Sequence, residues 1–276
     1  MEEQIKKIYS QMKRLTAEAI FMGLSCIIMF TIFVSIFEGN PLPNVVEDGW
    51  ILEKPHLWIW VAIMSVILER LWLGKRVKNI YHPFISLLED KCDPVALRWG
   101  TQYAIGYGRE HNESKSAIYY FEHQHIMALN ALGEFSEAIH YLQHSWVSEN
   151  QNKIRDRWLM VARLNEASER GHVGLYMRIW NELPPAMKKN IEVQAQMLQL
   201  QGKYEDALKM FQMIRGKKLF TIVSQQAGIA ECLVKMGRGE DAREYLEFVL
   251  QNANTTVYKQ NAIRDLERLE DRCNIE

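Results

Sequence analysis

The chain has 276 residues, of which 48% are hydrophobic and 24% are charged, and its formal net charge is −1. This near-neutral balance gives no global electrostatic case for a nucleic acid or another polyanion as partner. The four cysteines form no Cys-x-x-Cys pair, which argues against a zinc site and a disulfide framework and suits a reducing compartment. Prolines fall at the breaks between periodic segments, so the sequence predicts an all-α chain.

The N-terminal third is dominated by apolar residues. Residues 1–18 place apolar side chains on one stripe with lysines opposite, which predicts either an amphipathic helix at a membrane interface or a plain extension of the next helix. Residues 19–37 carry no charge over 19 positions, which at about 1.5 Å per residue span roughly 28 Å, close to a bilayer core. A signal peptide would have a shorter apolar region and a small-x-small cleavage site. A transmembrane helix is therefore predicted at 19–37.

A second apolar run, residues 57–73, has tryptophans at both ends, as interfacial aromatic belts do. Glu69 and Arg70 lie within about one turn of its end, so their charges can reach the headgroups. The run is predicted to be transmembrane helix 2. Basic residues flank both runs, whereas the loop between them, 38–56, is acidic. By the positive-inside rule this loop is extracytoplasmic, and both termini of this multi-pass cell-membrane protein are cytoplasmic.

Three later stretches share one pattern. Each has a glycine, an acidic residue four positions later, an alanine five later and a large apolar residue nine later. The glycines are Gly133, Gly202 and Gly237, and a weaker copy starts at Gly171. Such a glycine closes the turn between two antiparallel helices, where a positive φ is needed, and the apolar residues fill the core between them. A period near 34 with two helices per unit is typical of a solenoid.

These stretches resemble the tetratricopeptide repeat (TPR) family over roughly residues 115–254, about half the chain. The family's Trp-x-x-Leu-Gly opening is missing, and Gly239 stands where Phe135 and Tyr204 stand in the other copies. The resemblance implies a TPR-like α-solenoid of antiparallel helix pairs within residues 74–276. The predicted topology places this domain in the cytoplasm, after the N-terminal two-helix transmembrane hairpin.

The segments outside the repeats are predicted to be the ends of the solenoid. Residues 84–91 look like a short helix after a proline, and residues 94–108 like a helix with an Asp-Pro start. A charged amphipathic stretch at about 256–272 suits a capping helix over the last repeat.

No catalytic arrangement stands out in the sequence. His123-x-His125 and His140-x-x-x-His144 lack the neighbouring ligands of a zinc site, so solvated helix-surface histidines are expected there. A lone Gly-x-Gly at 106–108 has no preceding strand, and no Gly-x-Ser-x-Gly occurs. The chain is therefore expected not to be an enzyme and to use no cofactor or metal.

Binding is expected instead, on the first helix of each pair, which by the family resemblance lines the concave face. Amide side chains with an occasional aromatic suit an extended peptide. The candidate partner-binding residues are Tyr120, His123, Gln124, Met127, Asn130, Trp158, Val161, Asn165, Lys189, Glu192, Gln196 and Gln199.

The function predicted from these features is a membrane-anchored TPR-type adaptor or scaffold. Two spans hold it in the lipid bilayer, and it binds a protein or peptide partner, and no nucleic acid, at the cytoplasmic membrane face. The alternative is an accessory subunit of a membrane transport, secretion or envelope-assembly complex, in which the transmembrane hairpin makes the key contacts.

Overall fold

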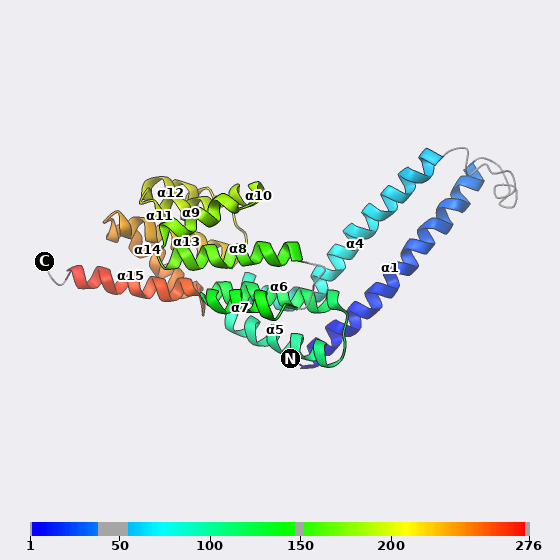
Figure 1. Ribbon diagram of the computed structural model, residues 1–276, viewed down its shortest axis with the longest axis horizontal. Helices are drawn as coiled ribbons and strands as arrows, with labels where there is room; N and C mark the ends of the chain where they lie inside the picture. Colours follow the sequence, from blue (N-terminus) through cyan, green and yellow to red (C-terminus); the bar gives the residue numbers. More distant parts are fainter. Residues whose placement is uncertain (1, 38–54, 147–151, 274–276) are drawn as a thin grey trace. The chain divides into compact units, whose positions relative to one another are not determined.

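The computed structural model describes residues 2–37, 55–146 and 152–273, and every regular element in these ranges is helical (Figure 1). Within the helices, the side chains of 22, 26–27, 29–37, 55–62, 65–66, 69 and 272–273 lie outside this description. The predicted loop at 38–56 lies almost wholly outside the described residues. The all-α prediction is confirmed. The chain divides into two units, Met1–His82 and Pro83–Glu276, which are taken in turn.

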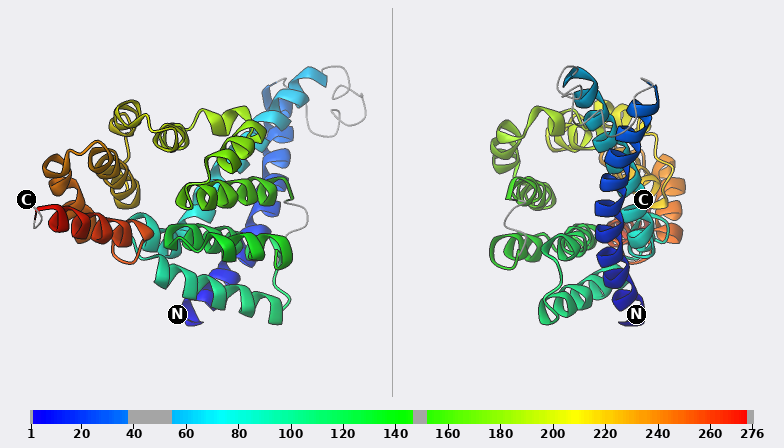
Figure 2. Two further views of the ribbon diagram at one scale, coloured as in Figure 1. Left: turned by 60° about the vertical axis from the view of Figure 1, so that its left-hand side comes forward. Right: turned by 90° about the vertical axis from the view of Figure 1, so that its right-hand side faces the viewer.

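The N-terminal unit consists of α1 (Glu2–Phe37) and most of α4 (Pro55–Glu89), which lie side by side in both sets of views (Figures 1 and 2). Because α1 is unbroken, its first turns extend the helix that follows them. The apolar stripe of these turns, which includes Ile5, Ile8 and Tyr9, is buried. These two observations favour the plain extension over a helix lying on a membrane surface.

Further along, both helices turn large apolar side chains outward. The exposed residues of this apolar belt are Ile20, Phe21, Leu24 and Ile28 on α1, and Ile63, Met64, Ile67, Leu68 and Leu71 on α4. Among the residues that the structure describes, no helix combines the length and the apolar character needed to cross a membrane. The predicted spans, 19–37 and 57–73, lie within α1 and α4 and remain predictions from the sequence.

The last turns of α4 correct the expectation of a separate short helix at 84–91. The helix continues through Pro83 and ends at Glu89. A proline inside a helix removes one backbone hydrogen bond and is normally disfavoured. Here Tyr81, Phe84 and Leu88 are all nearly fully buried along one face. Packing of that face outweighs the local preference for a break.

The C-terminal unit is an array of helical hairpins. After the end of α4 come α5 (Pro94–Glu110), α6 (Lys115–Leu132), α7 (Phe135–His144), α8 (Asn152–Glu169), α9 (Val173–Glu182), α10 (Pro185–Lys188), α11 (Ile191–Leu200), α12 (Tyr204–Gln212), α13 (Leu219–Lys235), α14 (Gly239–Asn252) and α15 (Val257–Cys273). The repeated pairs are α6–α7, α8–α9, α11–α12 and α13–α14 (Figure 2). The predicted terminal helix at about 256–272 corresponds to α15, which packs on α13 and α14.

The turn between the two helices of each pair has the same geometry four times. Gly133, Gly171, Gly202 and Gly237 have φ values of 78°, 64°, 74° and 77°. In each pair, the N–H of the residue after the glycine donates to the carbonyl oxygen five residues earlier, at 2.8 to 2.9 Å. This is the Schellman arrangement, which a glycine in the left-handed region permits. The predicted turn is therefore confirmed, including the weaker copy.

The cores of the pairs also follow the predicted positions. The alanines five residues after the glycines, Ala138, Ala207 and Ala242, are fully buried. In the weaker copy Tyr176 takes the alanine position, is equally buried, and donates its hydroxyl hydrogen to the carbonyl oxygen of Val193 at 3.2 Å. A small residue lets two helices approach closely, and the tyrosine hydroxyl finds a partner as a buried polar group must.

The two ends of the C-terminal unit meet. Lys218 Nζ lies 2.8 Å from Asp90 Oδ1, although the residues are 128 positions apart. Cys92 is fully buried in the same hydrophobic cluster as Val223 and Ala253. The turn between α4 and α5 is thus part of the core that α13, α14 and α15 build, and α15 covers more than the last repeat.

Candidate functional site

The predicted binding residues lie on α6, α8 and α11, the first helices of three pairs, with Lys189 in the turn before α11. Within the array α6 packs against α8, and α11 packs against α13. We call the surface formed by the predicted residues the candidate face. Most of its side chains are only partly buried, with Tyr120 at 36% exposure and Lys189 also exposed.

One end of the candidate face is aromatic. His123 on α6 meets Trp158 on α8 edge to face, with ring centroids 5.1 Å apart. Tyr119 lies 5.7 Å from Tyr120 and 5.8 Å from Trp146, again in edge contacts. We call these five residues the aromatic cluster. Such edge-to-face pairs each contribute about 0.5 to 1.5 kcal/mol beyond area burial. The cluster therefore has a defined shape and offers both apolar ring surface and polar ring edges.

Two members of the aromatic cluster, Tyr119 and Trp146, were not among the predicted residues. Tyr119 precedes a predicted position by one residue, and Trp146 follows the end of α7, where the repeat pattern makes no statement. The tyrosine pair at 119–120, whose second member is a predicted residue, was the only sequence signal for the cluster.

Desolvation lowers the pKa of His123, which keeps its ring neutral near pH 7.

Several predicted amides join one repeat to the next. Asn165 Nδ2 on α8 donates to Asn130 Oδ1 on α6 at 3.2 Å, and Asn130 Nδ2 donates to the carbonyl oxygen of Ile126 at 2.9 Å. These bonds use the side chains that were expected to meet the backbone of a peptide. They fix the spacing of α6 and α8 instead.

The third repeat shows the same use of polar side chains. Ser224 Oγ on α13 donates to Glu192 Oε1 on α11. Gln199 Nε2 lies 3.4 Å from both the carbonyl oxygen of Gly228 and Cys232 Sγ. Glu192 and Gln199 therefore connect adjacent first helices. The remaining predicted residues on this face, Gln124, Met127, Val161 and Gln196, are half-buried.

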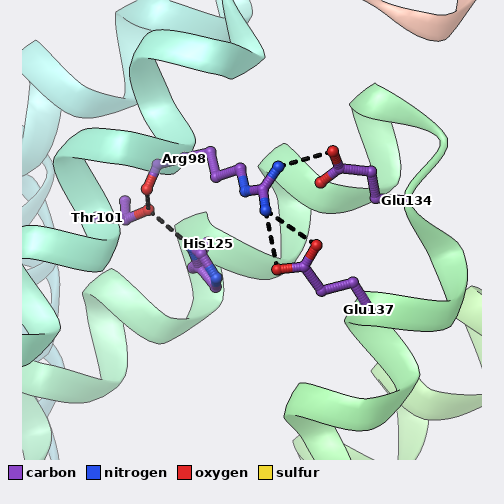
Figure 3. Close-up of polar contacts among 5 residues, drawn as sticks. All are labelled: Arg98, Thr101, His125, Glu134 and Glu137. Atoms are coloured by element: carbon purple, nitrogen blue, oxygen red, sulfur yellow. Dashed lines mark hydrogen bonds and ion pairs between the residues drawn. The ribbon is translucent and has the colours of Figure 1, made fainter.

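A network of charged side chains joins α5 to the first repeat (Figure 3). Arg98 Nη1 on α5 lies 2.7 Å from Glu134 Oε1, and its Nη2 lies 2.9 and 3.0 Å from the two carboxylate oxygens of Glu137. The two glutamates stand at the start of α7, and a guanidinium suits such two-sided pairing. This network holds the first turn of α7 against α5.

Next to it, Thr101 Oγ1 on α5 lies 3.0 Å from His125 Nδ1 on α6. His125 is 4% exposed, and burial together with the positive charges of Arg98 and Arg109 lowers its pKa to about 4. The ring is neutral at physiological pH, so it acts here as a hydrogen-bonding core residue. The expected solvated histidine is thus corrected at this position, because α5 covers it.

Glu122 on α6 is fully buried. It accepts a hydrogen bond from the Tyr141 hydroxyl at 3.2 Å and lies 3.8 Å from Arg109 Nη2. Burial and the neighbouring carboxylate raise the pKa of Tyr141, which keeps the hydroxyl protonated as the donor. A buried carboxylate needs such partners to offset its desolvation.

The second histidine pair of the sequence lies on the helix after the first repeat turn. His140 and His144 lie on α7 with ring centroids 4.8 Å apart. In the described ranges, no group of three or more His, Cys, Asp or Glu residues is arranged to hold a metal ion. A candidate interaction surface, the candidate face with its aromatic cluster, is what the geometry offers.

Comparison of the chain with protein-family models, with curated proteins and with solved structures finds no match in any of the three. The repeat pattern, the turn geometry and the surfaces of the two units are therefore the features that bear on function.

Proposed function

We propose that this chain is a membrane-anchored TPR-type adaptor that binds a protein or peptide segment on the candidate face of its helical array. The observation that carries the proposal is the turn geometry, which occurs four times with the same left-handed glycine and the same Schellman bond. Arrays of this kind present continuous surfaces built from corresponding positions of successive repeats. The candidate face is such a set of positions.

The exposed apolar side chains of the N-terminal unit support the membrane anchor. The apolar belt places nine large apolar side chains in contact with solvent on two neighbouring helices. Exposed apolar surface of this extent marks a membrane or protein contact. Since the uncharged run at 19–37 has the length of a bilayer core, we favour lipid as the covering. Both termini and the array would then face the cytoplasm.

On the candidate face, the aromatic cluster is the part that we expect to contact the partner first. Tyrosine and tryptophan give large contact areas at a low cost in conformational entropy and are enriched among residues that dominate binding. The amides of Asn130 and Asn165 already pair with each other, so we expect them to support the face rather than to bind. Tyr120, Trp158 and Gln196, whose side chains are not used in these bonds, are the positions chosen to test the face.

Site-specific photocrosslinking in native membranes tests this proposal. A photoreactive residue at Tyr120 or Gln196 should give the same crosslinked partner, whereas one at Gln143 or Gln212 should not. The two control glutamines are exposed on α7 and α12, the second helices of their pairs. Trp158→Ala should reduce the crosslink at Tyr120. Equal crosslinking from all four positions, or none from the candidate face, would refute the assignment of the face.

The second candidate function is the accessory membrane subunit, and the apolar belt is the observation that favours it. In that case the belt packs against other membrane proteins, and the array serves as a spacer. Replacing residues 19–37 and 57–73 with an unrelated membrane hairpin distinguishes the two functions. An adaptor keeps its crosslinks at Tyr120 after the exchange, whereas an accessory subunit loses its place in the complex.

A further inference from the structure

Basic residues gather where the apolar belt ends. On α1 these are Lys13 and Arg14, just before the first exposed apolar residues. On α4 they are Lys75, Arg76 and Lys78, just after the last ones. We call these five residues the basic collar. All five are exposed, with the Arg14 side chain at 81%. The only acidic residue in the same two stretches, 13–19 and 72–79, is Glu18, which pairs with Arg14 at 2.7 Å.

The two halves of the basic collar belong to one end of the hairpin. Because α1 and α4 are neighbours that run in opposite directions, the residues before the belt on α1 and those after it on α4 lie at the same end (Figure 1). At about 1.5 Å per residue, Arg14 lies roughly 9 Å from Ile20 along the axis, and Arg76 roughly 7.5 Å from Leu71. The Arg76 spacing falls within the thickness of a lipid headgroup layer, about 5 to 8 Å per leaflet, and the Arg14 spacing exceeds it by about 1 Å.

A tryptophan marks the same level. The Arg76 guanidinium carbon lies 5.5 Å from the centre of the Trp72 ring. Tryptophan prefers the boundary between hydrocarbon and headgroups, and a cation over its ring is held there by the ring's negative face. The guanidinium is thereby held at the depth where lipid phosphates lie, and it can bind a phosphate through two parallel hydrogen bonds.

We propose that the basic collar is a binding site for anionic phospholipid headgroups, which selects phosphatidylglycerol-type lipids over zwitterionic ones. The inference rests on the proposed membrane anchor and adds a lipid preference to it. Charge complementarity is the argument for this occupant, since Lys75, Arg76 and Lys78 are exposed cations in a stretch, 72–79, that contains no acidic residue. Each basic residue near an anionic surface contributes roughly fivefold in affinity, about 1 kcal/mol.

The test measures the lipids retained by the full chain after purification in a neutral detergent. Equal amounts of phosphatidylglycerol and phosphatidylcholine are added, and bound lipid is counted by native mass spectrometry. The chain should retain phosphatidylglycerol at least about tenfold better. The triple variant Lys75→Gln, Arg76→Gln and Lys78→Gln should lose most of this preference.

A matched control removes the same charge elsewhere, at Lys203, Lys209 and Lys217, which are exposed in the C-terminal unit. It should keep the preference, and equal loss in both variants would show a net-charge effect and overturn the site. The proposal would also be overturned if the unsubstituted chain showed no preference for phosphatidylglycerol. Carbonate extraction of native membranes tests the anchor separately. Release by carbonate together with a collar-dependent lipid preference would contradict the spans and leave the headgroup site standing.

Discussion

The substitution Gly133→Ala tests whether α15 closes against the first repeat turn. Gly133 has a φ of 78°, and a methyl group built on it would lie 2.9 Å from Cγ2 and 3.3 Å from Cβ of Val257. Alanine in the left-handed region costs about 1 to 2 kcal/mol. Crowding of a packed side chain typically adds about 1 to 3 kcal/mol. The free energy of unfolding should therefore fall by roughly 2 to 5 kcal/mol.

A glycine at another repeat turn provides a control for the backbone contribution to this loss of unfolding free energy. Gly202 has a φ of 74° and nothing within 4 Å of the added methyl group. Gly202→Ala should therefore lower the free energy of unfolding only by the cost of placing alanine in the left-handed region, about 1 to 2 kcal/mol. Urea unfolding of the full chain in detergent, followed by tryptophan fluorescence, measures both variants. The comparison uses differences between variants, because a chain of two units need not unfold in one step.

A second substitution isolates the contact itself. Val257→Ala removes Cγ2, the nearer of the two atoms that the new methyl group would meet. In a double-mutant cycle it should recover roughly 1 kcal/mol or more of the Gly133→Ala loss. Equal losses for Gly133→Ala and Gly202→Ala, with no coupling to Val257, would refute the closure of the array at this turn.

Three further predictions concern the interior of the C-terminal unit. His125 has a folded pKa of about 4, below its ordinary value of 6.5, so the unfolded chain takes up the proton first. The contribution of His125 to stability should be constant above pH 6.5 and should fall by about 1.4 kcal/mol per pH unit between 6.5 and 4, and urea titrations of His125→Gln should show a slope reduced by this contribution. A methyl group on Gly228 would meet the ring of Phe211, so Gly228→Ala should lower the melting temperature by several degrees, corresponding to about 1 to 3 kcal/mol, and a double-mutant cycle with Phe211→Leu should recover part of this loss. Arg98→Met and Glu137→Gln should show a coupling of about 0.5 to 1 kcal/mol that shrinks in high salt; additive losses would mean that the pair is not formed in solution.

Three turns of the array adopt a positive φ without a glycine. Cys92, Asn112 and Asn254 adopt positive φ values of 49°, 51° and 44° at the turns before α5, before α6 and before α15. The repeat pattern is marked by glycine, which enters this region at no steric cost. Asparagine does so less readily, and a cysteine there is held by burial, because Cys92 is fully enclosed in the core. These turns depend on the packing around them.

The candidate site was predictable only in outline. The period of the repeat located α6, α8 and α11 as the first helices of their pairs, since position in a hairpin follows from local spacing. It could not show that Asn130 pairs with Asn165, or that Glu192 pairs with Ser224. Which amide meets which neighbour depends on how two successive helices are offset, and no local pattern encodes that offset.

The sequence by itself determined the all-α class, the repeated hairpins and their left-handed glycine turns. Each of these depends on residues within about ten positions of one another, so local periodicity and the steric freedom of glycine are sufficient. Only the tertiary structure decided that α4 continues through Pro83, that His125 lies in the core, and that Asp90 meets Lys218. These features join segments far apart in the chain, where burial and pairing of side chains outweigh local preference.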